Sequence, residues 1–102
     1  MIMNIEHDKE KEIFSVVVDG VTAHVSYKLI DGGLDIRHTI VPDEIAGRGI
    51  ASALVKAAYD YALENGYKPV ATCSYAVVWL QRHPEYNGKI GNDFGGEGTC
   101  AV

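Results

Sequence analysis

Residues 42–55, PDEIAGRGIASALV, place two glycines immediately before a helical pattern. From Gly49 onward, apolar residues recur with the period of about 3.6 that is typical of an amphipathic helix. Glycine destabilises a helix interior, so Gly47 and Gly49 at the start of this helix need a physical reason. Either the chain turns sharply there with a positive φ, or a ligand comes close to the backbone. The apolar stripe that follows consists of Ile50, Leu54, Ala57, Ala58 and Tyr61.

The segment before the glycines predicts a three-stranded antiparallel meander. Residues 12–18 and 21–29 have the pattern of strands, and Asp19-Gly20 between them suits a two-residue hairpin turn. Residues 34–41 form the third strand, after a second turn rich in aspartate and glycine. Alternation in this strand predicts one face with Leu34, Ile36, His38 and Ile40, and an opposite face with Asp35, Arg37 and Thr39.

The helix and the segment after it predict a parallel pairing. Asn65-Gly66 ends the helix, because the residue after the last turn favours a left-handed conformation. Residues 68–73, KPVATC, then form a short apolar strand. A strand, a helix and a returning strand make a right-handed crossover, so strands 34–41 and 68–73 should run parallel.

A second, shorter helix completes the predicted fold. Ser74 can cap residues 75–83, and Pro84 ends the helix because proline disfavours helical geometry at the residue before it. Residues 87–102 contain five glycines and little periodicity, which predicts a glycine-rich tail. We therefore expect one α/β domain over residues 1–86, followed by that tail.

Composition narrows the class of protein. A chain of 102 residues, 47% of them hydrophobic, can form one modest core. The formal net charge of −5 disfavours nucleic acid as a partner. No run approaches the ~20 apolar residues of a membrane span, and no charged leader is present, so we expect a cytoplasmic protein that does not contact membranes. A monomer or weak dimer is expected.

The cysteines and histidines predict neither a disulfide framework nor a metal site. No pair among Cys73, Cys100 and the four histidines has the spacing of zinc ligands. We expect His24 to be structural and His7, near the start of the chain, to be solvated.

The glycine turn is also a candidate anion site. A helix N-terminus leaves its first amides unpaired, and the helix dipole is positive there. Because Gly47 and Gly49 lack side chains, a phosphate could approach these amides, and Arg48 could add a charged contact. The residues alone leave both this interpretation and a bare strand-to-helix turn open.

Residues 36–86 resemble a small branch of the GCN5-related N-acetyltransferase superfamily. Residues 44–49, EIAGRG, correspond to its coenzyme A signature, Gln/Arg-x-x-Gly-x-Gly/Ala. HTIVP before the signature, and CSY, WL and RHPEY after it, are also similar to the branch. Glu44 departs from the signature, because it places an acidic side chain where the family has Gln or Arg.

The resemblance implies a compact GNAT-like domain that binds acetyl-coenzyme A and transfers its acetyl group to an unidentified amine. The alternative is a non-catalytic module that binds coenzyme A or an acyl-coenzyme A. The implied catalytic residues are His38 as a base or Cys73 as a transient acyl acceptor. The implied cofactor-binding residues are Ile40, Val41, Gly47, Arg48, Gly49, Ile50, Ala51, Ser52, Ser74, Tyr75, Arg82 and His83.

The residues themselves leave other roles open. Cys73, at the start of a helix, could be a reactive thiolate or a small buried hydrophobic residue. His38 could act as a base or form hydrogen bonds within the sheet face. Arg82 and His83 could meet the adenosine 3′-phosphate or the negative end of their own helix. Tyr75 could pack in the core instead of contacting a cofactor.

Overall fold

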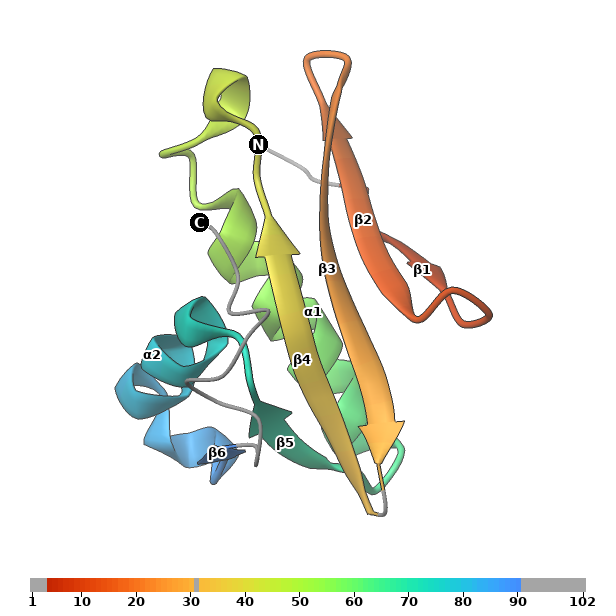
Figure 1. The fold of residues 1–102 in the computed structure, drawn as a ribbon, viewed down its shortest axis with the longest axis vertical. Helices are drawn as coiled ribbons and strands as arrows, with labels where there is room; N and C mark the ends of the chain where they lie inside the picture. The colour runs from red at the N-terminus through yellow and green to blue at the C-terminus, as the bar shows by residue number, and fades with distance from the viewer. Residues whose placement is uncertain (1–3, 31, 91–102) are drawn as a thin grey trace.

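A six-stranded mixed sheet in chain order forms the frame of the computed structural model, which describes residues 4–30 and 32–90 (Figure 1). Its strands are β1 Glu6–Asp8, β2 Ile13–Val18, β3 Val21–Ile30, β4 Gly33–Ile40, β5 Lys68–Ala71 and β6 Lys89–Ile90. Strands β1 to β4 pair antiparallel, whereas β5 is parallel to β4 and β6 is parallel to β5. The predicted meander and the parallel strand after the helix are confirmed, and β1 and β6 extend the sheet at its two edges.

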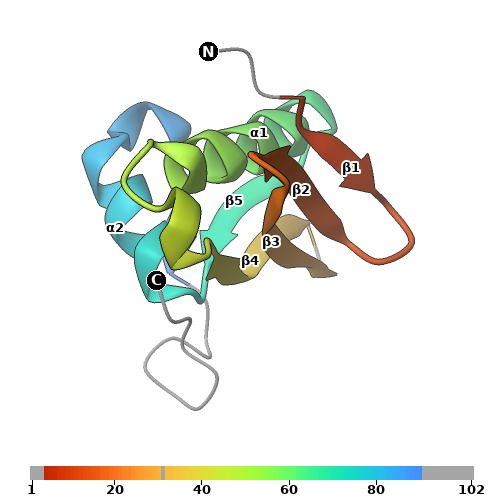
Figure 2. The same ribbon diagram turned by 90° about the horizontal axis from the view of Figure 1, so that it is seen from above.

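Two helices cover one face of this sheet, which is the arrangement expected when both crossovers, β4-α1-β5 and β5-α2-β6, follow the right-handed rule. The helices are α1 Ile50–Glu64 and α2 Ser74–Arg82, with short 3₁₀ turns η1 Asp43–Ile45 and η2 Pro84–Tyr86. Figure 2 shows α1 lying over the sheet and α2 beside it. Trp79 joins the helices, since its Nε1 donates to Ser52 Oγ at 2.9 Å and its ring lies 5.7 Å from that of Tyr59.

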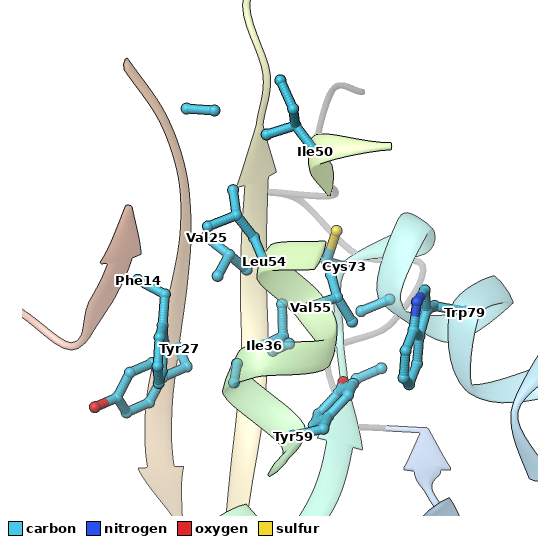
Figure 3. Close-up of a cluster of buried hydrophobic side chains, with 14 of the residues drawn as sticks. Phe14, Val25, Tyr27, Ile36, Ile50, Leu54, Val55, Tyr59, Cys73 and Trp79 are labelled. Atoms are coloured by element: carbon cyan, nitrogen blue, oxygen red, sulfur yellow. The ribbon is translucent and has the colours of Figure 1, made fainter. Parts of the chain in front are cut away.

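The core lies between the sheet and the helices (Figure 3). Alternate residues of β2 and β3 point toward α1. Of the predicted apolar stripe of α1, Ile50, Leu54 and Ala58 are buried, whereas Ala57 and Tyr61 are only partly buried. The buried face of the helix also includes Val55, Tyr59 and Ala62. The largest fully buried side chains of the core include Tyr59, Leu34, Ile36, Ile45, Ile50 and Leu54.

A β-bulge in β4 overturns the predicted alternation of that strand. Tyr27 pairs with Ile36, but the preceding Ser26 pairs with His38, so Arg37 is one extra residue. The inward face therefore continues from Ile36 to Thr39, which is fully buried. The prediction is correct for Leu34 and Ile36 but wrong for His38 and Ile40, which are exposed on the opposite face.

The first strand corrects the expectation that His7 is solvated. The His7 ring stacks on Phe14 with centroids 3.9 Å apart, and its Nε2 lies 2.5 Å from the Tyr27 hydroxyl. Burial lowers the pKa of His7 below its ordinary value and raises the pKa of Tyr27 to about 12. His7 therefore attaches the edge strand β1 to the core.

Residues 87–90 belong to the folded body, although the sequence predicts a loose tail from residue 87. Asn87 has a φ of 52° after η2, and Gly88 packs so closely that a Cβ there would lie 2.4 Å from Leu80 Cδ1. Lys89 and Ile90 then pair with β5. The rest of the predicted tail, residues 91–102 with Cys100, lies outside the described residues.

Candidate functional site

The two glycines of the turn adopt conformations that other residues rarely adopt. Gly47 has a φ of 82°, and Gly49, the residue before α1, has a φ of 76°. Left-handed backbone accounts for glycine at both positions. A Cβ added to either residue would meet no atom of residues 4–30 and 32–90 within 4 Å, so these residues leave the space above the turn open. Both reasons for glycine therefore hold at this turn: a positive φ and room for a close approach.

The start of α1 presents free amide donors toward this space. In the part of the chain that the structure describes, no side chain caps the helix, and its first turn contains no acidic residue. The Ala53 amide donates to the Gly49 carbonyl at 3.1 Å, which begins the helical hydrogen-bond pattern. The amides of Ile50, Ala51 and Ser52 precede that first bond, so the helix itself offers them no acceptor. They form a positively polarised end suited to an anion.

A cavity of about 240 Å³ lies against this turn. It is formed by the connection between β4 and α1, the first turn of α1 and the start of α2. Its volume is below the roughly 300–1,000 Å³ of sites that enclose a drug-sized ligand, so it would hold part of an elongated molecule. The lining residues are Val41, Asp43, Ala46, Gly47, Gly49, Ile50, Ala51 and Tyr75.

Six of the predicted cofactor-binding residues line this cavity. Asp43 also lines it, although it was not among the residues predicted to bind the cofactor. Asp43 is exposed and lines the cavity at the start of α1, where the helix dipole favours an anion. Glu44, the departure from the signature, is also exposed and does not line the cavity. The nearby acidic charge therefore comes from both residues, but only Asp43 reaches the cavity wall.

Strands β4 and β5 part beyond their four paired residues (Figure 1). Their pairing runs from Gly33–Lys68 to Ile36–Ala71 and then stops. The Ile36 carbonyl accepts from the amides of both Thr72 and Cys73 at 3.0 Å, after which the chain turns into α2. We call this position the divergence point. Beyond it, β4 continues to Ile40 with β3 as its only strand partner among the described residues.

Buried polar side chains gather at the divergence point. In the described chain, the buried polar or charged residues are Asp35, Thr39 and Thr72. Thr72 Oγ1 lies 2.9 Å from both carboxylate oxygens of Asp35, and Arg37 Nη1 lies 3.1 Å from Oδ2. The Cys73 sulfur lies 3.4 Å from Thr39 Oγ1. The burial of these three polar residues was not predicted from the sequence, although an aspartate inside an apolar strand was a signal.

The two implied catalytic residues lie on different faces of β4. Cys73 occupies the predicted junction of strand and helix, but its side chain is fully buried (Figure 3). Its sulfur is disulfide-bonded, so the expectation that the chain forms no disulfide is wrong for Cys73. The Thr39 side chain beside it points inward, whereas His38, the residue before Thr39 in the strand, points outward. His38 is exposed and pairs across the sheet with Ser26.

The remaining predicted cofactor residues have varied surroundings. Arg48 is half-exposed and forms an ion pair with Asp19 of the β2–β3 turn at 2.6 Å. Ser52 accepts from Trp79, and Ser74 begins α2 beside the cavity residue Tyr75. Ile40 is 38% exposed on the outer face of the sheet.

Arg82 and His83 lie at the other end of α2 from the cavity. Arg82 is eight positions after Ser74, and a helix rises about 1.5 Å per residue. The His83 ring stacks on Trp79 with centroids 3.9 Å apart, and its Nδ1 lies 2.8 Å from the Trp79 carbonyl oxygen. His83 therefore packs against its own helix, and neither residue lines the cavity.

Known proteins resemble this chain over most of its length. The family model described as GCN5-related N-acetyl-transferase matches residues 13–89. Protein NATD1 of mouse is 36% identical over 85 residues, which cover 80% of this chain and 77% of that protein. Protein NATD1 of zebrafish is 34% identical over 93 residues, covering 86% and 84%.

A solved structure has the same architecture. The NMR solution structure of a GCN5-like candidate N-acetyltransferase from Staphylococcus aureus matches with a TM-score of 0.67 and 30% identity. The match covers 86% of this chain and 87% of that one. Neither helix of the described chain has the length and hydropathy of a membrane span, and residues 4–30 and 32–90 hold no cluster of three or more potential metal ligands.

Proposed function

Because the chain belongs to the GCN5-related N-acetyltransferase family, we propose that it binds acetyl-coenzyme A at the glycine turn and transfers the acetyl group to an amine. The observation that supports this most directly is the pair of left-handed glycines below open space at an uncapped helix start. A phosphate group needs this combination of free amides and unobstructed approach.

The residues around the turn fit parts of the cofactor. Its pyrophosphate would accept from the amides of residues 47–52, and Arg48 would add a charged contact. Val41 and Tyr75 would contact the pantetheine arm, which would pass along β4 beyond the divergence point. Asp43 on the cavity wall opposes anion binding through its charge, so we expect this site to bind less tightly than one without it.

The proposed chemistry is direct transfer. Bound acetyl-coenzyme A would supply the acetyl group as a thioester. The amine nitrogen would form a bond to the acetyl carbonyl carbon, the C–S bond would break, and coenzyme A would leave as a thiolate that takes a proton from water. His38, exposed on the outer face of β4, would accept the proton that the attacking amine loses. We favour this route over an acyl-cysteine because the Cys73 side chain is fully buried and its sulfur is disulfide-bonded, so it offers no thiolate to accept the acetyl group.

Gly49→Val tests the cofactor site, and Gly66→Val is its matched control. Both glycines have a φ of 76°, and a Cβ at either would meet nothing within 4 Å, so valine strains the backbone similarly. Only Gly49 lines the cavity. We expect Gly49→Val to weaken coenzyme A binding at least tenfold, about 1.4 kcal/mol, beyond any effect of the control. Equal affinities in titrations followed by backbone amide shifts would refute the site.

A panel of amines tests the transfer itself. Parent protein with acetyl-coenzyme A is offered polyamines and lysine peptides, and acetylated product is measured. If transfer is direct and His38 is the base, His38→Gln should lose turnover and Cys73→Ala should keep it. Binding without transfer to any amine would instead assign a non-catalytic coenzyme A-binding module.

A further inference from the structure

The buried carboxylate of Asp35 has no role in the proposed chemistry, yet it occupies a costly position. Asp35 is 3% exposed, as is its partner Thr72. A carboxylate removed from water destabilises the fold unless hydrogen bonds and an opposite charge compensate. Thr72 provides the hydrogen bonds, and Arg37 provides the charge.

These contacts connect three structural features. Asp35 is in the second-to-last residue pair between β4 and β5. Arg37 is the bulge residue of β4, and Thr72 begins the segment that leads into α2. We propose that Asp35 and Thr72 form a positioning pair that fixes where β4 and β5 part, and thereby shapes the path of the coenzyme A arm. This inference rests on the proposed function.

The geometry explains why a polar pair suits this task. A hydroxyl that donates to a carboxylate has a defined length and direction, whereas apolar side chains can slide across one another. Thr72 is held to β4 by its side chain, through Asp35, and by its amide, through the Ile36 carbonyl at 3.0 Å. These two attachments set the direction in which the chain enters α2.

The start of α2 carries the effect to the cavity. Tyr75, which lines the cavity opposite the glycine turn, follows Thr72 by three residues. A change in the position of Thr72 therefore moves one wall of the cavity while the glycine turn stays in place. The pair does not touch the cavity itself, so it acts through the wall residues and not as a ligand contact.

Thr72→Val removes the hydroxyl and keeps the shape of the side chain, while Thr72→Ser keeps the hydroxyl. Tyr59→Phe is the matched control, because the Tyr59 hydroxyl is also buried and donates to a carbonyl of β5, that of Val70, at 2.8 Å. All variants are made in the full chain. Amide hydrogen exchange is measured without ligand, and coenzyme A affinity is measured by amide shifts well below each melting temperature.

We expect Thr72→Val to speed exchange of the Thr72 and Cys73 amides and to weaken coenzyme A binding about tenfold, since small misplacements at a binding site have large effects. Thr72→Ser and Tyr59→Phe should both bind within about twofold of the parent. If Thr72→Val does not fold, Thr72→Ala removes the same hydroxyl without added bulk.

The outcomes separate the two proposals. A parent protein that does not bind coenzyme A refutes the proposed function. A parent that binds, with Thr72→Val binding as tightly as Tyr59→Phe, refutes the positioning pair and leaves the function intact. Unchanged exchange at Thr72 and Cys73 also refutes the positioning pair, whatever the affinity.

Discussion

The two halves of β4 contrast sharply within one strand. Gly33 to Ile36 pair with β3 on one side and β5 on the other, and Leu34 and Ile36 are fully buried. Arg37 to Ile40 keep β3 but lose β5, and the bulge exchanges the two faces. The half that pairs with a strand on each side, residues 33–36, contributes buried side chains to the core. The singly paired half leaves one edge available to a ligand and presents His38 outward.

The largest expected effect tests this division directly. Leu34→Ala in the first half removes a fully buried side chain and should lower the free energy of unfolding by about 2–5 kcal/mol. Ile40→Ala in the second half removes a side chain that is 38% exposed and should cost about 1 kcal/mol or less. Urea denaturation of both variants measures the difference. Similar losses would show that both halves contribute equally to the core.

Sequence reasoning succeeded where local chemistry decides the structure. Positive φ at Gly47 and Gly49, the helix they precede and the parallel strand after it follow from residue preferences and crossover handedness. Six of the cavity-lining residues are also among those that the family resemblance implies for cofactor binding, and that role stays a prediction.

It failed where tertiary packing decides the structure. One extra residue in β4 reverses every side chain after it, and no residue type near Arg37 marks that position. His7 looks like a residue of a polar N-terminal segment, and only the folded sheet brings it to Phe14 and Tyr27. Asp35 and Thr72 are 37 positions apart, so their pairing depends on the crossover and not on local pattern.

A smaller effect on stability is expected from pH. It should distinguish His7, on the inner face of the sheet, from His38, on the outer face. Burial lowers the pKa of His7, so protonation favours the unfolded chain. The stabilisation is complete above the unfolded pKa of about 6.5 and declines as pH falls toward the lower folded pKa. His7→Phe, which retains ring packing on Phe14, should reduce the fall in melting temperature between about pH 7.5 and 5.

His38→Gln is the control for this experiment, because His38 is exposed on the outer face of the second half of β4. The parent and His38→Gln should show the same dependence of melting temperature on pH. A His7→Phe variant that retains the full dependence would mean that another group is responsible, and that β1 is not held by a neutral imidazole.

The smallest effect concerns the ion pair between the glycine turn and the β2–β3 hairpin. Arg48 and Asp19 are 40% and 68% exposed, and such pairs contribute about 0–1 kcal/mol to stability. Asp19 has a φ of 52°, which asparagine tolerates well, so Asp19→Asn removes the charge with little backbone strain. This change should leave stability within about 0.5 kcal/mol of the parent.

Coenzyme A affinity should respond differently. Asp19→Asn frees Arg48 and removes a negative charge near the proposed phosphate site, so we expect binding to tighten about twofold at low salt and the gain to fade near 1 M salt. Glu64→Gln, an exposed carboxylate at the far end of α1, changes the net charge equally and should not tighten binding. Weaker binding by Asp19→Asn would contradict competition for Arg48. Asp19 would then orient the guanidinium toward the ligand, and the ion pair would belong to the binding site.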